Sequence, residues 1–157
     1  MIVTGQGGTG KSVLVDAITE TFSHFQSGAA LAKCGTTGVA ATQISGTTLH
    51  SWVGLGIGRL KSVTSASKVT TARRKKNILG KTCLIIDEMS MLYDTLFTDV
   101  DKIISFIKKS EHEGNEFLPF GGMHVILMGD FHQFPPVARP HSALYSLHPT
   151  SDADALW

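Results

Sequence analysis

The stretch GQGGTGKS, at residues 5–12, constrains the fold of this chain more than any other segment. A short apolar run at residues 1–4 precedes it, and apolar side chains at helical spacing follow it. Glycines allow a backbone to turn tightly and to pass close to a bound group. The segment therefore predicts a strand, a glycine-rich turn and a helix in immediate succession. We expect the helix to bury a stripe made of Val13, Leu14, Ala17, Ile18, Thr21, Phe22 and Phe25.

Apolar runs and helical patterns alternate along the rest of the chain, with a glycine-containing loop and one helical turn expected at residues 47–58. We expect strands at residues 29–34, 82–87 and 124–128. We expect helices at residues 37–44, 68–79 and 90–109. The run TCLIID lacks polar alternation, which is typical of a strand buried on both faces of a parallel sheet. This order predicts a doubly wound α/β sheet. The stripe expected on the last helix consists of Leu92, Leu96, Val100, Ile103, Ile104 and Ile107.

The residues GQGGTGKS also match the pattern G-x-x-x-x-G-K-[ST], in which loop amides and a helix N-terminus surround a polyphosphate. In that arrangement the Lys11 ammonium reaches the β and γ phosphates, and the Ser12 hydroxyl ligates magnesium. A glycine turn that merely caps a helix would explain the glycines but not the Lys-Ser pair. We therefore expect ATP or another nucleoside triphosphate, with Mg²⁺, to be held by Gly7, Gly8, Thr9, Gly10, Lys11 and Ser12.

Two further strand ends supply polar side chains for such a site. We expect Asp87 to hold Mg²⁺ while Glu88 orients and deprotonates the attacking water. Gln133 is a candidate sensor of the γ phosphate, and a simple loop amide is the alternative. The predicted catalytic residues are therefore Glu88, Lys11 and Gln133. The guanine-specific pattern N-K-x-D is absent from the sequence, which argues against a signalling GTPase.

Composition limits the remaining classes of protein. A chain of 157 residues is the size of one domain, and no apolar run reaches the ~18 residues that a membrane helix needs. We therefore expect an intracellular protein without a membrane partner. Cys34 and Cys83 each lie in an apolar run, which favours buried thiols over a disulfide or a metal site. The seven histidines show no zinc-binding spacing.

Basic residues are concentrated in one segment, although the net charge of the chain is only +1. A solvated surface is the commoner explanation of such a block, and an electrostatic contact with nucleic acid is the alternative. Composition alone favours the solvated surface. Residues 59–81 contain no acidic residue and eight of the 14 basic ones, namely Arg59, Lys61, Lys68, Arg73, Arg74, Lys75, Lys76 and Lys81.

Four blocks of the sequence carry a family likeness: GQGGTGKS, CGTTGVAATQISGTTLHSW, LIIDEMSML and PFGGMHVILMGDFHQFPPV. Together they resemble the superfamily 1 DNA helicases of the PIF (petite integration frequency) type, which include the helicase domains of Helitron transposons. The stretch at residues 96–128, with PFGG before a strand, is similar to that family's own signature. The likeness covers nearly the whole chain.

The resemblance implies an α/β, three-layer P-loop NTPase (RecA-like) domain with a mainly parallel sheet. In the family, two such motor domains move along single-stranded DNA in the 5′-to-3′ direction, driven by ATP. A helix N-terminus beside small hydroxyl residues suits phosphate contacts, which agrees with the implied DNA path. Trp52 either stacks on a base or packs in the core. By resemblance, the DNA-binding candidates are Thr36, Thr37, Gly38, Thr48 and His50.

The resemblance also implies parts that are absent from residues 1–157. We expect a partial first motor domain, truncated at both ends, without the second RecA-like domain and the arginines that it directs at the γ phosphate. Arg139 matches none of these arginines, and His132 and Phe134 depart from the family's third motif. Because such arginines contribute on the order of 10³-fold or more to turnover, we expect the chain alone to bind nucleotide and to hydrolyse it poorly.

Other interpretations remain open on the sequence. A truncated or transposon-derived module that binds nucleotide or DNA without turnover is the main alternative. A small-molecule kinase would need an arginine-rich lid, which the sequence lacks. The resemblance implies roles in DNA repair, recombination and telomere maintenance, and a nuclear or mitochondrial location in a eukaryote. The sequence does not indicate an oligomeric state.

Overall fold

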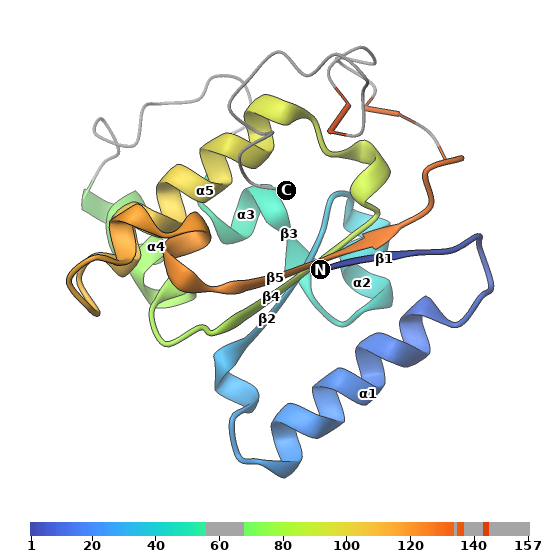
Figure 1. The fold of residues 1–157 in the computed structure, drawn as a ribbon, viewed down its shortest axis with the longest axis horizontal. Coiled ribbons are helices and arrows are strands. Elements are labelled where there is room, and N and C mark those ends of the chain that lie inside the picture. The colour runs from blue at the N-terminus through green and yellow to red at the C-terminus, as the bar shows by residue number, and fades with distance from the viewer. Residues whose placement is uncertain (56–67, 134, 137–142, 145–157) are drawn as a thin grey trace.

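Five strands form one sheet, and every pairing between the described strands is parallel (Figure 1). The computed structural model describes residues 1–55, 68–133, 135–136 and 143–144, with only the backbone of residues 68–70. The strand order is β1-β5-β4-β2-β3. The strands are β1 (Ile2–Thr4), β2 (Leu31–Gly35), β3 (Thr47–Thr48), β4 (Cys83–Asp87) and β5 (His124–Gly129).

Strand β4 lies at the centre of this order, and all of its residues are buried. Its side chains alternate between the two faces of the sheet. Leu84 and Ile86 belong to one apolar cluster, and Cys83 and Ile85 belong to the other. Because both faces are covered, the strand contains no polar residue before Asp87. The prediction of a strand buried on both faces is confirmed.

Helices cover both faces of the sheet, which gives the three layers visible in Figure 1. Helix α1 (Lys11–His24) packs on one face, together with the C-terminal end of α2 (Gly38–Gln43). Helices α3 (Leu49–Trp52), α4 (Lys68–Ile78) and α5 (Asp94–Lys108) pack on the opposite face. The predicted three-layer α/β fold is confirmed.

The buried face of α1 differs from the predicted stripe. Val15 is only 1% exposed, and Ile18 and Phe22 pack beside it, partly buried, against the sheet. Val13 and Phe25, which the predicted stripe included, are 70% and 73% exposed. The prediction is confirmed for Ile18 and Phe22 and is wrong for Val13 and Phe25. Apolar residues occur on more than one side of this helix, so periodicity alone does not single out the buried face.

The long helix begins later than predicted. Met89–Met91 forms a 3₁₀ turn, and α5 starts at Asp94 instead of residue 90. Its predicted stripe is buried all the same. Thr47–Thr48 forms an edge strand where a loop was expected. Trp52 is 6% exposed within the core, so its packing interpretation is the correct one.

The two cysteines are buried and free, as predicted. Burial raises the pKa of the Cys34 thiol to about 12, and it also raises the pKa of Cys83. Both thiols are therefore protonated at neutral pH and serve as small apolar side chains. In the part of the chain that the structure describes, every helix is too short or too polar to span a membrane.

The block PFGG forms a tight turn held against α5. Phe120 and Gly121 have φ angles of 51° and 58°, and the Gly121 amide donates to the Ser105 hydroxyl at 3.0 Å. A β-carbon at position 121 would lie 2.7 Å from Cβ of Lys108, so only glycine fits there. The Phe120 ring packs on Phe97, with ring centroids 5.0 Å apart. This block therefore shapes the entry into β5, at the edge of the sheet where that strand begins.

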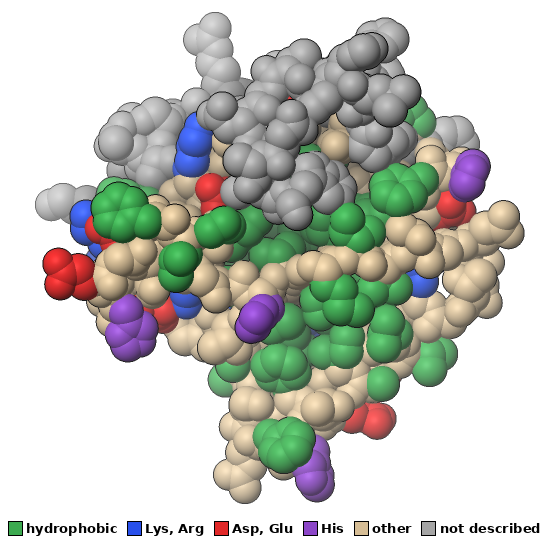
Figure 2. All heavy atoms as spheres, in the orientation of Figure 1, with side chains coloured by type: hydrophobic (Ala, Val, Ile, Leu, Met, Phe, Trp, Pro, Cys, Tyr) green, Lys and Arg blue, Asp and Glu red, His purple; other side chains and the backbone are tan. Residues whose placement is uncertain are grey.

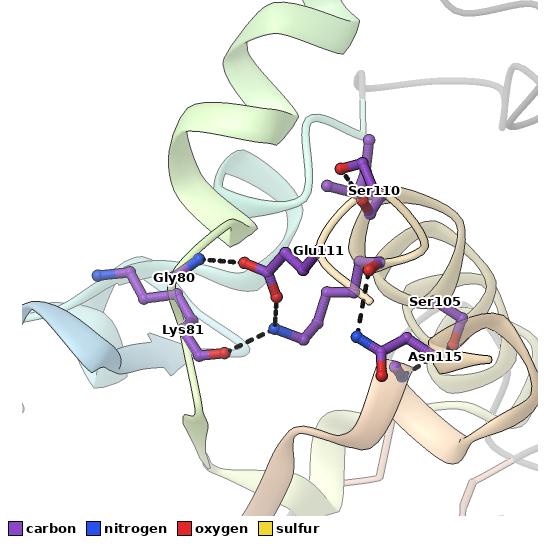
Figure 3. Close-up of polar contacts among 9 residues, drawn as sticks. Gly80, Lys81, Ser105, Ser110, Glu111 and Asn115 are labelled. Carbon is purple, nitrogen blue, oxygen red and sulfur yellow. Dashed lines mark hydrogen bonds and ion pairs between the residues drawn. The ribbon is translucent and has the colours of Figure 1, made fainter. Parts of the chain in front are cut away.

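A buried lysine connects α5 to the segment that leads into β4 (Figure 3). Lys108 is 6% exposed, forms an ion pair with Glu111 and donates to the Lys81 carbonyl at 2.9 Å. Glu111 also accepts from the Gly80 amide, and the Asn115 side chain donates to the Lys108 carbonyl at 3.2 Å. A buried charge needs such partners. The network therefore fixes the position of α5 relative to the start of β4.

The basic segment contains one structural arginine. Arg74 is 3% exposed and donates to the carbonyls of Val53, at 2.9 Å, and Gly54, at 3.3 Å. Asn77 donates to the Trp52 carbonyl at 2.8 Å. Two side chains of α4 thus hold the C-terminal end of α3. The solvated-surface interpretation of the block is wrong for Arg74, because its hydrogen bonds are made inside the fold.

Other members of the block do face solvent. Arg73, Lys75 and Lys76 are exposed on α4, as the solvated-surface interpretation expects. Arg59 and Lys61 lie outside the described residues, and so does the side chain of Lys68. Among the described members of the block, the exposed residues of α4 are therefore available for an electrostatic role.

Arg74→Ala should lower the free energy of unfolding by about 2–3 kcal/mol, because two carbonyls lose a charged donor and a buried side chain is removed. Arg73→Ala, one residue earlier and exposed, is the matched control and should change it by less than ~0.5 kcal/mol. Urea denaturation followed by circular dichroism measures both values. Equal effects of the two substitutions would contradict the structural role of Arg74.

Candidate functional site

Polar segments follow β1, β2, β4 and β5 at the points where these strands end. Because the strands are parallel, their carboxyl ends share one edge of the sheet. A cavity of about 560 Å³ lies at this edge. Its lining residues are Gly7, Gly8, Gly10, Lys11, Ser12, Gln43, Asp87, Glu88 and Gln133.

This cavity gathers the residues predicted for nucleotide and magnesium, with the exception of Thr9. The Thr9 hydroxyl donates to the Gln6 carbonyl at 2.8 Å, so this side chain braces the loop. Gln43, the last residue of α2, lines the cavity but was not predicted. The sequence carries no signal for Gln43 beyond its place in the second family block, because only the fold brings the end of α2 to the loop.

A second cavity, of about 540 Å³, lies at the opposite edge, where β1, β4 and β5 begin. Figure 2 shows hydrophobic side chains gathered on this side of the molecule. The lining is mainly apolar and includes Met1, Ile2, Phe22, Phe97, Phe120 and Leu127. None of the residues predicted for nucleotide or DNA lines it. This second cavity is therefore separate from the residues predicted to bind nucleotide, magnesium and DNA.

The glycine-rich loop is shaped by its own backbone. Gly8 and Gly10 have φ angles of 79° and 92°, which glycine adopts without steric cost. The Gly5 amide donates to the Gly129 carbonyl at 3.1 Å, which ties the loop to the end of β5. Helix α1 has no side-chain cap and no acidic residue in its first turn. The amides at its N-terminus are therefore available to an anion.

The Lys11 ammonium lies between the loop and the acidic pair. It donates to the Gly5 carbonyl and, at 2.9 Å, to the Gln6 carbonyl. Burial raises the pKa of Asp87, while a hydrogen bond from the Glu88 backbone and the charge of Lys11 oppose that rise. Among the described residues that line the cavity, Lys11 is the only cation. It is therefore the group in this cavity that can meet a polyphosphate with positive charge.

Glu88 stands in a strongly negative environment. Burial is the largest cause of its raised pKa, and the charges of Asp87 and Asp130 raise that pKa further. Lys11 has the opposite effect and lowers it. Asp130 is 8% exposed and accepts a hydrogen bond from the His132 amide at 2.9 Å. The sequence GDFHQ at residues 129–133 marks this strand end as polar, but Asp130 was not among the predicted site residues. Three carboxylates therefore lie close together at this edge. A bound divalent cation would reduce the repulsion that opposes the ionisation of Glu88.

Oxygen donors in the cavity fit magnesium. The Ser12 hydroxyl and the Asp87 carboxylate are ligands of the type that Mg²⁺ prefers. No group of three or more His, Cys, Asp or Glu side chains in the described ranges is arranged to hold a metal by itself. Magnesium usually keeps several waters and binds through one or two protein ligands plus substrate phosphates. The residues present are consistent with that kind of site.

The candidate DNA-binding residues lie where β2 and β3 end side by side. Gly35 pairs with Thr48 across these two strands. The Thr37 hydroxyl accepts from the Ala40 amide at 3.1 Å and caps α2, while the Thr48 hydroxyl accepts from the Ser51 amide at 3.3 Å and caps α3. Two capped helix starts therefore share this corner of the sheet.

The remaining DNA-binding candidates differ in their surroundings. Gly38 is exposed at the start of α2. Thr36 directs its hydroxyl inward, to the Glu88 carbonyl at 2.9 Å. Burial lowers the pKa of the half-buried His50, so its imidazole is neutral at pH 7. His50 therefore offers a ring face or a neutral hydrogen bond rather than a positive charge.

The family model described as "PIF1-like helicase" matches residues 1–157. The chain belongs to the PIF1-like helicase family. It is 37% identical to the ATP-dependent DNA helicase RRM3 of Saccharomyces cerevisiae over 142 residues, which cover 87% of this chain and 18% of that protein. The chain thus spans about a fifth of the length of the curated relatives it matches. The likeness predicted from the four sequence blocks is confirmed.

Solved structures of the family share the fold of this PIF1-like chain. The Pif1 helicase from Candida albicans superimposes with a TM-score of 0.70 at 30% identity, over 94% of this chain and 33% of that one. The Bacteroides Pif1 helicase in complex with ADP-AlF3 and ssDNA gives 0.66 at 31% identity, over 90% and 30%. These matches confirm the RecA-like, three-layer P-loop NTPase fold.

The raised pKa of Glu88 predicts that Glu88→Gln stabilises the ligand-free chain at neutral pH. The folded protein holds the Glu88 proton more tightly than the unfolded chain does, so this contribution is present at low pH and is lost as the pH rises through the folded-state pKa. Glutamine does not ionise and escapes that loss. Thermal melts should therefore give a higher Tm for the variant at about pH 7.5 and similar values below about pH 4.

Glu113→Gln, an exposed substitution of the same kind, controls for the removal of one negative charge. A Tm difference between Glu88→Gln and wild type that stays the same at both pH values would contradict the prediction.

Proposed function

We propose that this chain is the nucleotide-binding motor domain of an ATP-dependent DNA helicase that moves along single-stranded DNA in the 5′-to-3′ direction. The observation that supports this most is the cavity where Lys11, Ser12, Asp87, Glu88 and Gln133 meet. Relatives are named ATP-dependent DNA helicases, and a Bacteroides Pif1 helicase is described in complex with ADP-AlF3 and ssDNA. ATP, Mg²⁺ and single-stranded DNA are therefore the proposed ligands.

The loop and the start of α1 are proposed to hold the phosphates. Backbone amides at an uncapped helix N-terminus bind anions through partial positive charge and hydrogen bonds. Lys11 has to leave the Gly5 and Gln6 carbonyls in order to reach the β and γ phosphates. Ser12 and Asp87 would hold Mg²⁺, which supplies charge neutralisation on the phosphate oxygens. Each of these groups already borders the same cavity.

Glu88 is the proposed general base. A carboxylate whose pKa is raised accepts the proton of the attacking water more readily than an ordinary one. The backbone amide of Gln133 donates to the Asp130 carbonyl at 3.2 Å, and Gln133 lines the cavity. The Gln133 side chain is proposed to sense the γ phosphate from there. Its place in the same cavity lining as Gly8, Gly10 and Lys11 supports that role.

Single-stranded DNA is proposed to follow the corner where β2 and β3 end. Gly35 and Thr48 are register partners, so the residues after them lie close together. The start of α2 is exposed at Gly38, and its Thr37 cap leaves other amides of the first turn for a phosphate. Neutral His50 is proposed to contribute stacking to the same path.

Efficient turnover is proposed to need a cation from a second motor domain. Among the described lining residues Lys11 alone is positive, and an additional arginine in such sites contributes on the order of 10³-fold or more. We therefore expect slow hydrolysis by residues 1–157. A module that binds nucleotide and DNA without any turnover is the alternative. Strong stimulation of ATP hydrolysis in this chain by single-stranded DNA would contradict the need for a second domain.

Lys11→Ala should abolish nucleotide binding, because the loop loses both its charge and its phosphate contact. We expect the Kd for a fluorescent ATP analogue with Mg²⁺ to rise by about 100-fold or more, corresponding to one lost charge-assisted contact in a cavity with no other described cation. Lys102→Ala, an exposed substitution on α5, is the control and should leave the Kd unchanged. Wild-type affinity in the Lys11→Ala titration would refute the proposed phosphate site.

Glu88→Gln should separate binding from turnover. The variant keeps the size and the backbone of the site, so we expect nucleotide affinity within about threefold of wild type. Loss of a general base lowers the rate of the chemical step by about 10²–10⁴-fold. Single-turnover measurements with protein in excess detect this loss even when hydrolysis is slow. Hydrolysis at the wild-type rate would count against Glu88 as the base.

A further inference from the structure

The backbone of Glu88 has an unusual conformation that neighbouring strands hold in place. Its φ and ψ angles are 58° and 49°, in the left-handed region that residues with a side chain rarely adopt. The residue follows directly after the buried strand β4, so this turn sets the direction in which its carboxylate leaves the sheet. Such a conformation persists only where the surroundings enforce it.

Thr36 provides one side of that enforcement. Its hydroxyl donates to the Glu88 carbonyl at 2.9 Å, and its amide donates to the Asp87 carbonyl at 3.2 Å. The Glu88 carbonyl also accepts from the Met91 amide at 3.1 Å. A carbonyl oxygen has two lone pairs, and these two donors occupy both. The Thr36 hydroxyl has a single proton to donate, and that proton is directed at Glu88.

Gly129 provides the opposite side. A β-carbon at this position would lie 2.9 Å from the Met89 amide nitrogen and 3.6 Å from the Glu88 carbonyl carbon, so the end of β5 approaches this turn closely. The Gly129 carbonyl also accepts from the Gly5 amide of the glycine-rich loop. The Glu88 turn is therefore enclosed between the end of β2 and the end of β5, and any displacement of either strand end reaches it.

Thr36 also begins the segment that leads to α2. It lies between Gly35, whose partner is Thr48 on β3, and Thr37, which caps α2. A β-carbon at position 35 would lie 2.3 Å from the Ala41 amide nitrogen, so α2 sits tightly against the end of β2. The residues of the proposed DNA corner and the support of Glu88 are therefore consecutive in the chain and packed as one unit.

We propose that Thr36 is a positioning residue, whose hydroxyl fixes the left-handed backbone of Glu88 and thereby joins the DNA-contacting turn at residues 36–38 to the carboxylate that activates water. The link to DNA rests on the proposed function, whereas the positioning of Glu88 does not. Since the hydroxyl proton is committed to Glu88, a phosphate at this turn is met by backbone amides after Thr37. Movement of the turn upon DNA binding then shifts Glu88 directly.

Thr36→Val tests this, because valine keeps the shape and the branched β-carbon but cannot donate a hydrogen bond. Thr36→Ser restores the donor. Thr42→Val is the matched control. The Thr42 hydroxyl donates within α2, to the Gly38 carbonyl at 3.0 Å, so its loss removes no hydrogen bond from β4 or from Glu88. Thermal melts establish that each variant is folded before any comparison is made.

Two readouts on the ligand-free chain do not depend on turnover. In Thr36→Val, hydrogen exchange of the Met91 amide should accelerate by about tenfold, the effect of losing one hydrogen bond in the turn, while amides of β2 and β4 keep their protection. The pKa of Glu88, followed by carbon-13 NMR, should move toward its ordinary value as the carboxyl gains access to water. Thr36→Ser and Thr42→Val should behave as wild type in both measurements.

Kinetics provide the third readout. In single-turnover hydrolysis at saturating nucleotide, Thr36→Val should react about tenfold or more slowly than wild type, with the nucleotide Kd within about twofold, since a misplaced group affects the rate and not the binding. The effect of single-stranded DNA on the Met91 exchange rate should disappear in Thr36→Val and persist in Thr36→Ser. If wild-type hydrolysis is as slow as that of Glu88→Gln, the rate cannot report on Thr36, and the exchange and NMR measurements decide whether the proposal holds.

Unchanged exchange at Met91 and an unchanged Glu88 titration in Thr36→Val would overturn the proposal. A loss of protection spread over the whole sheet, with rate and affinity falling together and with no recovery in Thr36→Ser, would also overturn it, because it would show a merely structural role. The proposed function fails in a different way, namely when wild-type protein binds neither Mg²⁺-nucleotide nor single-stranded DNA.

Discussion

Burial of β4 on both faces is the constraint on which the rest of the structure depends. An entirely apolar strand has to lie between two layers of helices, and this fixes the point at which its first polar residues emerge. Because β5 and β2 run parallel on either side, their ends emerge at the same edge. The acidic pair, the glycine-rich loop and the segment before α2 therefore converge at this edge. The position of the candidate site therefore follows from the direction of the strands.

The same edge concentrates unfavourable features. A side-chain-bearing residue in the left-handed region costs of order 1–3 kcal/mol, and Glu88 is one of these. Burial opposes the ionisation of Asp87 and Glu88, and the charge of Asp87 further opposes the ionisation of Glu88. One hydrogen bond, such as that from Thr36, contributes about 1 kcal/mol and does not offset these costs alone. The stability must come from the two apolar clusters and from networks such as that of Lys108, which lie away from the site.

Much of the site could be predicted because its chemistry demands particular residue types in a fixed order. The loop, the acidic pair after an apolar run and the stripe of α5 all follow from local pattern. The buried face of α1 does not follow from local pattern alone, because apolar residues occur on several sides of the helix. Packing against the sheet is what buries Val15. The Thr36–Glu88 bond joins residues 52 positions apart, and the Arg74–Val53 bond joins residues 21 apart. Such pairs depend on strand order and helix packing, which local patterns do not specify.

In the ligand-free protein, the Lys11 ammonium is held by the Gly5 and Gln6 carbonyls of its own loop. The charge of Lys11 also opposes the rise in the pKa values of Asp87 and Glu88. On the proposed function, a polyphosphate would compete for the same charge and draw the lysine away from the Gly5 and Gln6 carbonyls. The loop would then lose the two bonds from Lys11 and keep those from Thr9 to the Gln6 carbonyl. Since Gly5 also bonds Gly129, which packs against the turn after Glu88, the effect of a bound phosphate would extend to the end of β5 as well as to the loop.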